Sequence, residues 1–159
     1  MKIAVPRESA SGETRVALTP QAAGQLVGDG VEVLIQAGAG ERSHLPDADY
    51  REAGATIVPD APALYGQADV VLRVGRPTDE EIAFLKPGTV LIGTLGTLAN
   101  PKLAEQLAKA GVTAISMDAI PRITRAQAMD TLSSQATVGG YKAVLLAAER
   151  LPKLSLIHI

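Results

Sequence analysis

The sequence contains no cysteine and no tryptophan, and aromatic residues make up only 3% of it. The lack of cysteine excludes disulfides, thiolate catalysis and cysteine-ligated metal sites, and it fits a reducing compartment. Because aromatics are so scarce, the 47% of hydrophobic residues consist mainly of Ala, Val, Leu and Ile. This composition is typical of parallel strands covered by helices.

The sequence also lacks an excess of either charge. It carries 15 basic and 17 acidic residues, for a net charge of -2, and no block of like charge stands out. A chain without a basic field has no electrostatic attraction for a phosphate backbone, so we expect no nucleic-acid partner. The two histidines, His44 and His158, lie far apart, and we expect no metal site.

No long hydrophobic run is present either. The longest weakly polar segment is VLIGTLGTLA, residues 90–99, well short of the ~20 residues that span a bilayer. Met1 leads directly into the strand-like KIAVP, which leaves no room for a signal peptide. We therefore expect a soluble chain that is not exported.

Apolar runs separated by turn residues alternate along the chain. They predict strands at residues 3–5, 31–36, 56–58, 70–74, 89–92 and 112–116, and helices at about 20–27, 47–53, 62–66, 79–85, 100–110 and 134–150. Thr19-Pro20 and Asn100-Pro101 are typical helix starts, and Gly111 is a typical helix end. Strands separated by helices imply right-handed parallel crossovers. We predict an α/β fold over residues 1–151, with a Rossmann-like (flavodoxin-like) parallel sheet and helices on both faces.

The last residues do not fit this pattern. LSLIHI, residues 154–159, follows an unfinished helix, ends abruptly on an apolar residue and resembles translated sequencing-adapter sequence. A short strand is the alternative. We expect residues 152–159 to be a non-native tail and leave them out of the fold.

Two glycine motifs follow predicted strands. Gly38-Ala39-Gly40 is similar to the start of a dinucleotide-binding fingerprint. Ser43 stands in place of the third glycine, and Pro46 interrupts the expected helix, so a flexible loop is the better interpretation. The second motif, GTLG at residues 93–96, could let a ligand approach the backbone, but a tight turn is the commoner role.

Two charged residues lie near strand ends. Arg15 could bind an anion or simply pair with Glu13, and the structural role is slightly favoured. Asp118, at the end of its strand, is expected to cap the turn that follows.

The polar stretch, which we define as residues 117–143 (MDAIPRITRAQAMDTLSSQATVGGYKA), follows the last predicted strand. Ligands of parallel sheets bind beyond the carboxyl ends of strands. Asp130 could accept from a carboxamide NH2 while Arg122 or Gln127 donates to its oxygen. Alternatively, Asp130, Ser133 or Ser134 could cap the last helix. The chemistry of these residues leaves both interpretations open.

Small residues recur in the last predicted helix. Ala136, Gly140, Ala143 and Ala147 lie near one face of it, which favours close packing against the sheet or against a partner subunit.

Several segments together resemble a known family. KIAVPRE, ETRVALTP, EVLIQAGAGE, ADVVLRVGRP and the polar stretch are similar to the start of the NAD(H)-binding subunit of proton-translocating nicotinamide nucleotide transhydrogenase. The similarity runs from residue 1 to about 151. The related alanine dehydrogenases share this N-terminal domain and are the alternative. A stand-alone binding or dimerisation domain is the non-enzymatic alternative.

Two positions discriminate between the enzymes. The resemblance to alanine dehydrogenases would place a lysine and a histidine where this chain has Gly75 and Gly96. Amino-acid oxidation needs an acid/base group and a cationic anchor, whereas hydride transfer between two nicotinamides needs two rings held close together in a dry site. The two glycines therefore favour the transhydrogenase.

The resemblance also implies roles for the polar stretch. Arg122, Asp130 and Ser133 would hold the carboxamide and ribose of NAD(H), and Gln127 would reach toward the NADP(H) ring. The expected cofactor-binding residues are Arg122, Thr124, Gln127, Asp130 and Ser133.

The implied partners follow from the same family. They are NADP(H)-binding and membrane-spanning transhydrogenase components and a second copy of the chain, at the cytoplasmic side of a membrane. Family members continue into a Rossmann domain that carries most NAD contacts. We therefore expect this chain to be a fragment that by itself binds NADH weakly or not at all.

Overall fold

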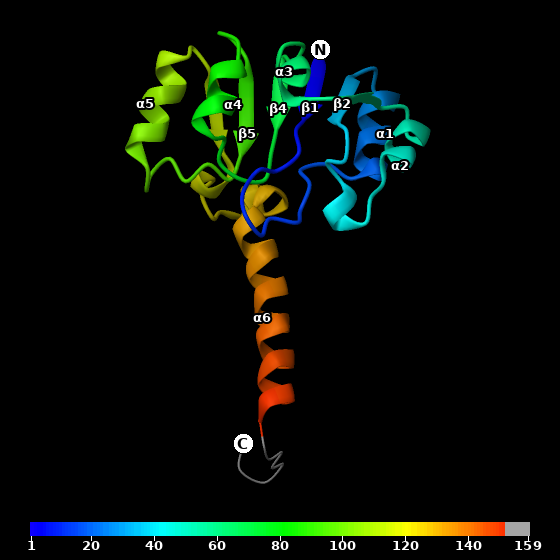
Figure 1. Cartoon of the computed structure of the whole chain (residues 1–159). Helices are drawn as coiled ribbons and strands as arrows, with labels where there is room; N and C mark the ends of the chain where they lie inside the picture. Colours follow the sequence, from blue (N-terminus) through cyan, green and yellow to red (C-terminus); the bar gives the residue numbers. More distant parts are fainter. Residues whose placement is uncertain (152–159) are drawn as a thin grey trace. The chain divides into compact units, whose positions relative to one another are not determined.

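The computed structural model describes residues 1–151 (Figure 1). By its internal contacts the chain separates into two compact units, Met1–Ala119 and Ile120–Ile159. The first unit contains the sheet, and the second contains most of the polar stretch. The expectations for residues 152–159 concern a segment outside the described residues.

One parallel sheet forms the first unit. Its strands are β1 (Lys2–Val5), β2 (Glu32–Gln36), β3 (Thr56–Val58), β4 (Val70–Leu72), β5 (Val90–Gly93) and β6 (Thr113–Ser116). They lie in the order β3-β2-β1-β4-β5-β6, and every neighbouring pair is parallel. This is the Rossmann strand order, in which β2 and β3 lie on one side of β1, and β4, β5 and β6 lie on the other. The prediction of a Rossmann-like α/β fold is confirmed.

Helices connect consecutive strands. They are α1 (Pro20–Gly28), α2 (Asp47–Glu52), α3 (Ala61–Tyr65), α4 (Asp79–Phe84) and α5 (Pro101–Lys109), with short 3-10 helices η1 (Glu41–Ser43) and η2 (Met117–Ala119). The predicted starts of α1 and α5 are confirmed, because the Thr19 and Asn100 side chains accept hydrogen bonds from backbone N–H groups in the first turns. Gly111, after α5, has the positive φ of 70° that suits glycine.

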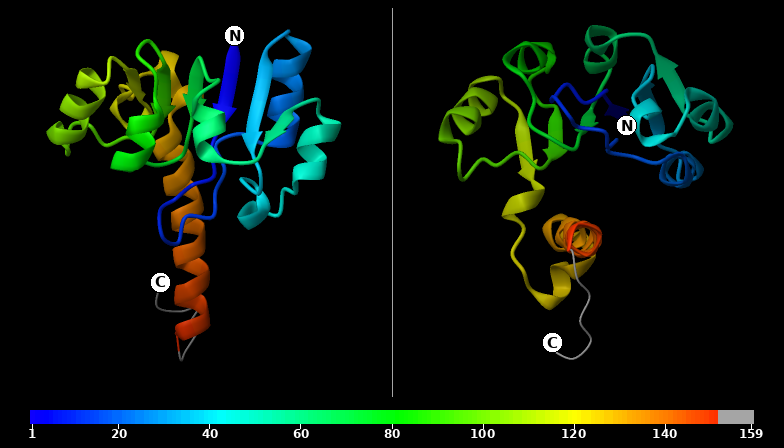
Figure 2. Two further views of the ribbon diagram at one scale, coloured as in Figure 1. Left: turned by 45° about the horizontal axis from the view of Figure 1, so that its top comes forward. Right: turned by 60° about the horizontal axis from the view of Figure 1, so that its bottom comes forward.

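The two faces of the sheet are covered by different helices. Alternate residues of a strand point to opposite faces, and the core divides accordingly into two clusters. Leu34 and Leu91 belong to the cluster that includes residues of α3, α4 and α5. Val33 and Ile35 belong to the one that includes residues of α1 and α2. Two further views show α1 and α2 near β2, and α4 and α5 near β5 (Figure 2).

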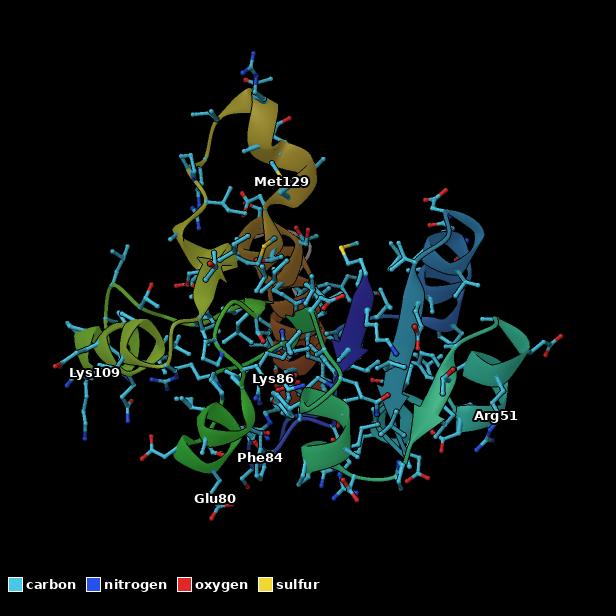
Figure 3. The ribbon with its side chains drawn as sticks, turned by 90° about the horizontal axis from the view of Figure 1, so that it is seen from above. Arg51, Glu80, Phe84, Lys86, Lys109 and Met129 are labelled. Carbon is cyan, nitrogen blue, oxygen red and sulfur yellow. The ribbon has the colours of Figure 1, made fainter. Side chains whose placement is uncertain are left out.

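The outer sides of these helices are polar. Arg51, Glu80 and Lys109 extend from α2, α4 and α5 away from the sheet (Figure 3). Hydrophobic residues on one side and charged residues on the other are what a helix needs to cover a sheet in water.

The first glycine motif forms a closely packed loop rather than a flexible one. The Gly38 N–H donates to the Asp47 carboxylate over 2.9 Å. A Cβ added at Gly40 would collide with the Leu45 carbonyl oxygen and lie 2.9 Å from the Tyr50 ring. The loop therefore uses its glycines for tight packing, and its Gly38 donor is already taken.

The second unit consists of a 3-10 helix, η3 (Thr124–Met129), and a long helix, α6 (Thr131–Arg150). Helix α6 begins three residues before the predicted position 134, because Asp130 rather than a later serine caps it. Its side chains are exposed along its length, except for Thr131, which is partly buried. A Cβ at Gly140 would meet no other atom within 4 Å. Close packing of the small residues stays a prediction.

Within residues 1–151, none of the helices combines the length and the apolar character that crossing a membrane would require.

Candidate functional site

A buried guanidinium lies at the carboxyl end of β4. The Arg73 side chain is fully buried and donates through Nη1 to the Glu81 carboxylate over 2.8 Å and to the Tyr65 hydroxyl over 3.1 Å. Its Nη2 donates to Glu8 over 3.3 Å. These four residues, Glu8, Tyr65, Arg73 and Glu81, are called the Arg73 cluster below.

Glu8 extends the cluster to the backbone that follows β4. Its carboxylate accepts from the N–H of Val74 over 2.6 Å and of Gly75 over 3.2 Å. Glu8 follows β1 in sequence, so it ties the loop after β1 to the loop after β4. Gly93, at the end of β5, leaves room for Arg73, since a Cβ there would lie 2.7 Å from the Arg73 carbonyl oxygen.

Local sequence explains how Glu81 is positioned. Helix α4 begins with a capping box, in which Thr78 accepts from the Glu81 N–H and the Glu81 side chain accepts from the Thr78 N–H. The same Glu81 carboxylate accepts from Arg73 and from the Ser9 hydroxyl. One side chain therefore joins the helix start to the buried cluster.

Burial shapes the protonation of this cluster. It raises the pKa of the Tyr65 hydroxyl, which stays protonated. For Arg73, burial lowers the pKa, but nearby Tyr65, Glu8 and Glu81 raise it, and the net change is upward. Removing one partner of such a group would strand a buried charge, at a typical cost of about 3–5 kcal/mol.

Arg15 pairs with Glu13, so the structural role favoured from the sequence is confirmed. Its guanidinium donates to both Glu13 oxygens, over 2.8 Å from Nε and 2.6 Å from Nη2. The hydrogen bonds from Arg15 lower the pKa of Glu13 to about 2. An Arg15 engaged in this way does not present a free cation to a substrate carboxylate.

Asp118 accepts hydrogen bonds from groups that precede it in the chain. Its Oδ1 accepts from the Ser116 hydroxyl over 2.7 Å and from the Gly96 N–H over 3.1 Å. Partial burial raises its pKa, while these hydrogen bonds lower it, and the net change is downward. The carboxylate thus joins the end of β6 to the loop after β5, and a cap on the turn that follows stays a prediction.

The five predicted cofactor-binding residues all lie in the second unit. Thr124 begins η3, Gln127 lies within it, and Arg122 precedes it. These three side chains are exposed. Asp130 and Ser133 lie at the start of α6. The five residues therefore lie in, or within two residues of, the adjacent helices η3 and α6.

Asp130 and Ser133 are already bonded to each other. The Asp130 carboxylate accepts from the Ser133 N–H over 3.0 Å and from its hydroxyl over 2.6 Å. These bonds, and to a smaller degree the charge of Arg122, lower the pKa of Asp130. The capping interpretation is thus confirmed for Asp130. A carboxylate has about four lone-pair positions, so capping does not use up its capacity to accept from a ligand.

Among the residues that the structure describes, no group of three or more His, Asp or Glu side chains could hold a metal ion.

Sequence patterns missed the Arg73 cluster. Two signals were available: an arginine inside the apolar run ADVVLRVG, and the TDEE segment at residues 78–81, which matches the capping box. Neither signal predicts that Arg73 and Glu81 would lie close to Glu8.

Comparison with known proteins adds a family. The model of the "Alanine dehydrogenase/PNT, N-terminal domain" family matches residues 4–139. An NAD(P) transhydrogenase alpha subunit of Rhodospirillum rubrum is 45% identical over 150 residues, covering 91% of this chain and 39% of that protein. "Alanine dehydrogenase" of Halomonas elongata is 39% identical over 153 residues, covering 96% and 41%. The chain thus spans about two fifths of the length of these relatives.

A solved structure is similar over nearly the whole chain. The transhydrogenase of Sinorhizobium meliloti superposes with a TM-score of 0.90 at 38% identity, covering 96% of this chain and 46% of that one.

The Glu13–Arg15 pair predicts a measurable pH effect. The pKa of Glu13 in the folded chain, about 2, lies below its ordinary value of 4.5. The pair therefore stabilises the fold above about pH 4.5, and this contribution is lost as the pH falls toward 2. Replacing Arg15→Ala should return the pKa of Glu13 toward 4.5, as measured by NMR titration of the side-chain carboxyl carbon.

The exposed pair of Lys2 with Glu32 provides the control for this titration. Lys2→Ala should leave the Glu13 titration unchanged. An Arg15→Ala chain whose Glu13 still titrates near 2 would contradict the assignment.

Proposed function

The chain belongs to the family of alanine dehydrogenase/PNT N-terminal domains, and on that premise we propose that it is part of the NAD(H)-binding component of a proton-translocating transhydrogenase. The complete protein would transfer a hydride from NADH to NADP+, which a separate domain or subunit binds. The observation that carries this proposal is the 45% identity to a transhydrogenase alpha subunit. The residues that occupy positions 75 and 96 support it.

Both positions are unsuited to amino-acid oxidation. Gly75 has no side chain, and its N–H donates to Glu8. Gly96 has a positive φ of 62°, and its N–H donates to Asp118. With Arg15 paired to Glu13, these places offer neither an acid/base group nor a free cationic anchor, which dehydrogenation of an amino acid would need.

Direct hydride transfer between two nicotinamides requires ring positioning rather than an acid/base group. Two nicotinamide rings must approach to about 3–3.5 Å with water excluded, and NAD(H) itself supplies the hydride chemistry. The protein has to bind and orient the carboxamide. Asp130 can accept from the carboxamide NH2, and Arg122 can donate to its oxygen.

The remaining residues of the set complete the positioning. Ser133, fixed by Asp130, together with Thr124 would contact the ribose side of the nicotinamide. Gln127 is exposed on η3 and would extend toward the NADP(H) ring. None of these roles involves a covalent intermediate or a proton transfer.

We further propose that the complete protein works as a dimer at the cytoplasmic side of a membrane, attached through partner components. The Rhodospirillum rubrum relative, which is described as an alpha subunit, supports a multi-subunit assembly.

The leading alternative, an alanine dehydrogenase, is supported by the Halomonas elongata relative. Two assays on the complete protein separate the functions: NADH with an NADP+ analogue and the partner components, and L-alanine with NAD+. We expect hydride transfer in the first assay and no reaction in the second. Alanine oxidation without transhydrogenation would establish the alternative, and inactivity in both would favour a non-catalytic binding or dimerisation module.

Gln127 provides a more specific prediction. Replacing Gln127→Ala in the complete protein should slow hydride transfer by about tenfold to a hundredfold, because small errors in ring placement have effects of that size. The dissociation constant for NADH should change by less than about threefold, since Gln127 contacts the second ring. Stopped-flow transfer rates and NADH titrations measure the two quantities.

An exposed glutamine on α1, Gln21, supplies the matched control, and Gln21→Ala should change neither quantity. The reverse pattern for Gln127→Ala, weak NADH binding with an unchanged transfer rate, would contradict its role.

A further inference from the structure

The Arg73 cluster lies at a particular point of the fold. In the order β3-β2-β1-β4-β5-β6, the chain adds strands on one side of β1 up to β3 and on the other side from β4 onward. The boundary between β1 and β4 is called the switch point below. In open α/β sheets the crevice beyond the carboxyl ends of these two strands is where ligands usually bind. The loops that follow β1 and β4 line this point, and they carry Glu8 and residues 73–75.

Three donors converge there on a single carboxylate. The backbone N–H groups of Val74 and Gly75 and the Nη2 of Arg73 all donate to Glu8, over 2.6, 3.2 and 3.3 Å. Successive backbone N–H groups beside a guanidinium form a recognised kind of anion site. Arg73 and Glu8 are 3% and 5% exposed, so water does not compete strongly for these bonds.

The chain itself provides the anion. We infer that Glu8 is an internal ligand, whose carboxylate occupies an anion-binding position formed by Arg73, Val74 and Gly75 at the β1–β4 switch point. The position has the size and the donors for a small monocarboxylate, and it accepts one from solution once the Glu8 side chain is shortened. This inference does not depend on the proposed function.

The space around the position is consistent with this occupant. A Cβ added at Gly75 would lie 3.5 Å from Oε2 of Glu8, in ordinary van der Waals contact. The carboxylate therefore fills the place up to the Gly75 backbone. In the intact chain the switch point is closed, and a nucleotide phosphate finds its donors taken.

Shortening Glu8 tests the inference by chemical rescue. The Glu8→Ala chain should melt at a lower temperature than the wild type, because Arg73 and two N–H groups lose their acceptor. Sodium acetate should restore stability saturably at constant ionic strength, raising the Tm by roughly 3–5 °C at a concentration about ten times its dissociation constant. Circular dichroism at matched chloride concentrations measures both effects. If the variant does not fold in chloride, acetate-dependent recovery of helicity is the readout.

Three chains serve as controls. The wild type should not respond to acetate beyond chloride, because its position is filled. Glu8→Ala combined with Arg73→Met should lose the response, because the central donor is gone. Glu32→Ala, which removes a carboxylate from an exposed pair with Lys2, should show none.

The location of binding is checked by NMR of the Glu8→Ala chain. Acetate should shift the amide signals of Val74 and Gly75 more than those of other loops. Stability of Glu8→Ala that is insensitive to acetate, or an equal response in the Glu32→Ala chain, would overturn the inference.

Discussion

One buried guanidinium joins the two halves of the parallel sheet. Arg73 lies at the end of β4 and bonds Glu8, which follows β1, and Glu81, which lies in the first turn of α4. In a Rossmann order the sheet reverses between these two strands, so no helix crossover directly connects their ends. The two strands are paired by their backbone ladder, and the cluster adds side-chain bonds beyond their carboxyl ends. The Glu8 bonds to the backbone of Val74 and Gly75 then fix the loop after β4.

The same interaction constrains what the first unit can bind. Its switch point is filled by its own carboxylate, Arg15 is paired with Glu13, and the Gly38 N–H is bonded to Asp47. Three places that could have received an anionic ligand are satisfied internally. In the second unit, by contrast, Arg122, Thr124 and Gln127 are exposed. The residues that we propose for the nicotinamide therefore belong to a different segment of the chain from the loops after β1 and β4.

Local signals made much of this fold predictable. Thr19-Pro20 and Asn100-Pro101 are short local signals that mark helix starts. The alternation of strands and helices along the chain defines the fold class. The Arg73 cluster was not predictable in this way. Glu8 and Arg73 are 65 residues apart, and their meeting depends on β1 lying next to β4. The bond from Gly96 to Asp118, 22 residues along the chain, was missed for the same reason.

The candidate site illustrates a second limit. From the sequence, Asp130 could equally cap a helix or accept from a carboxamide. The structure shows the cap, with bonds to the Ser133 N–H and hydroxyl. The two roles are compatible in principle, since the Asp130 carboxylate is only partly buried and retains lone pairs for a further donor. The roles proposed for Arg122 and Gln127 came from the family resemblance, because their local sequence pattern does not indicate a ligand.

We propose that this chain positions the nicotinamide and that the longer protein holds the rest of the dinucleotide. Calorimetric titration of NADH into the 159-residue chain, beside the longer protein proposed above, tests it most directly. We expect saturable binding by the longer protein and only weak heats, without saturation at micromolar NADH, for the chain by itself. Sub-micromolar NADH affinity of the isolated chain would contradict it.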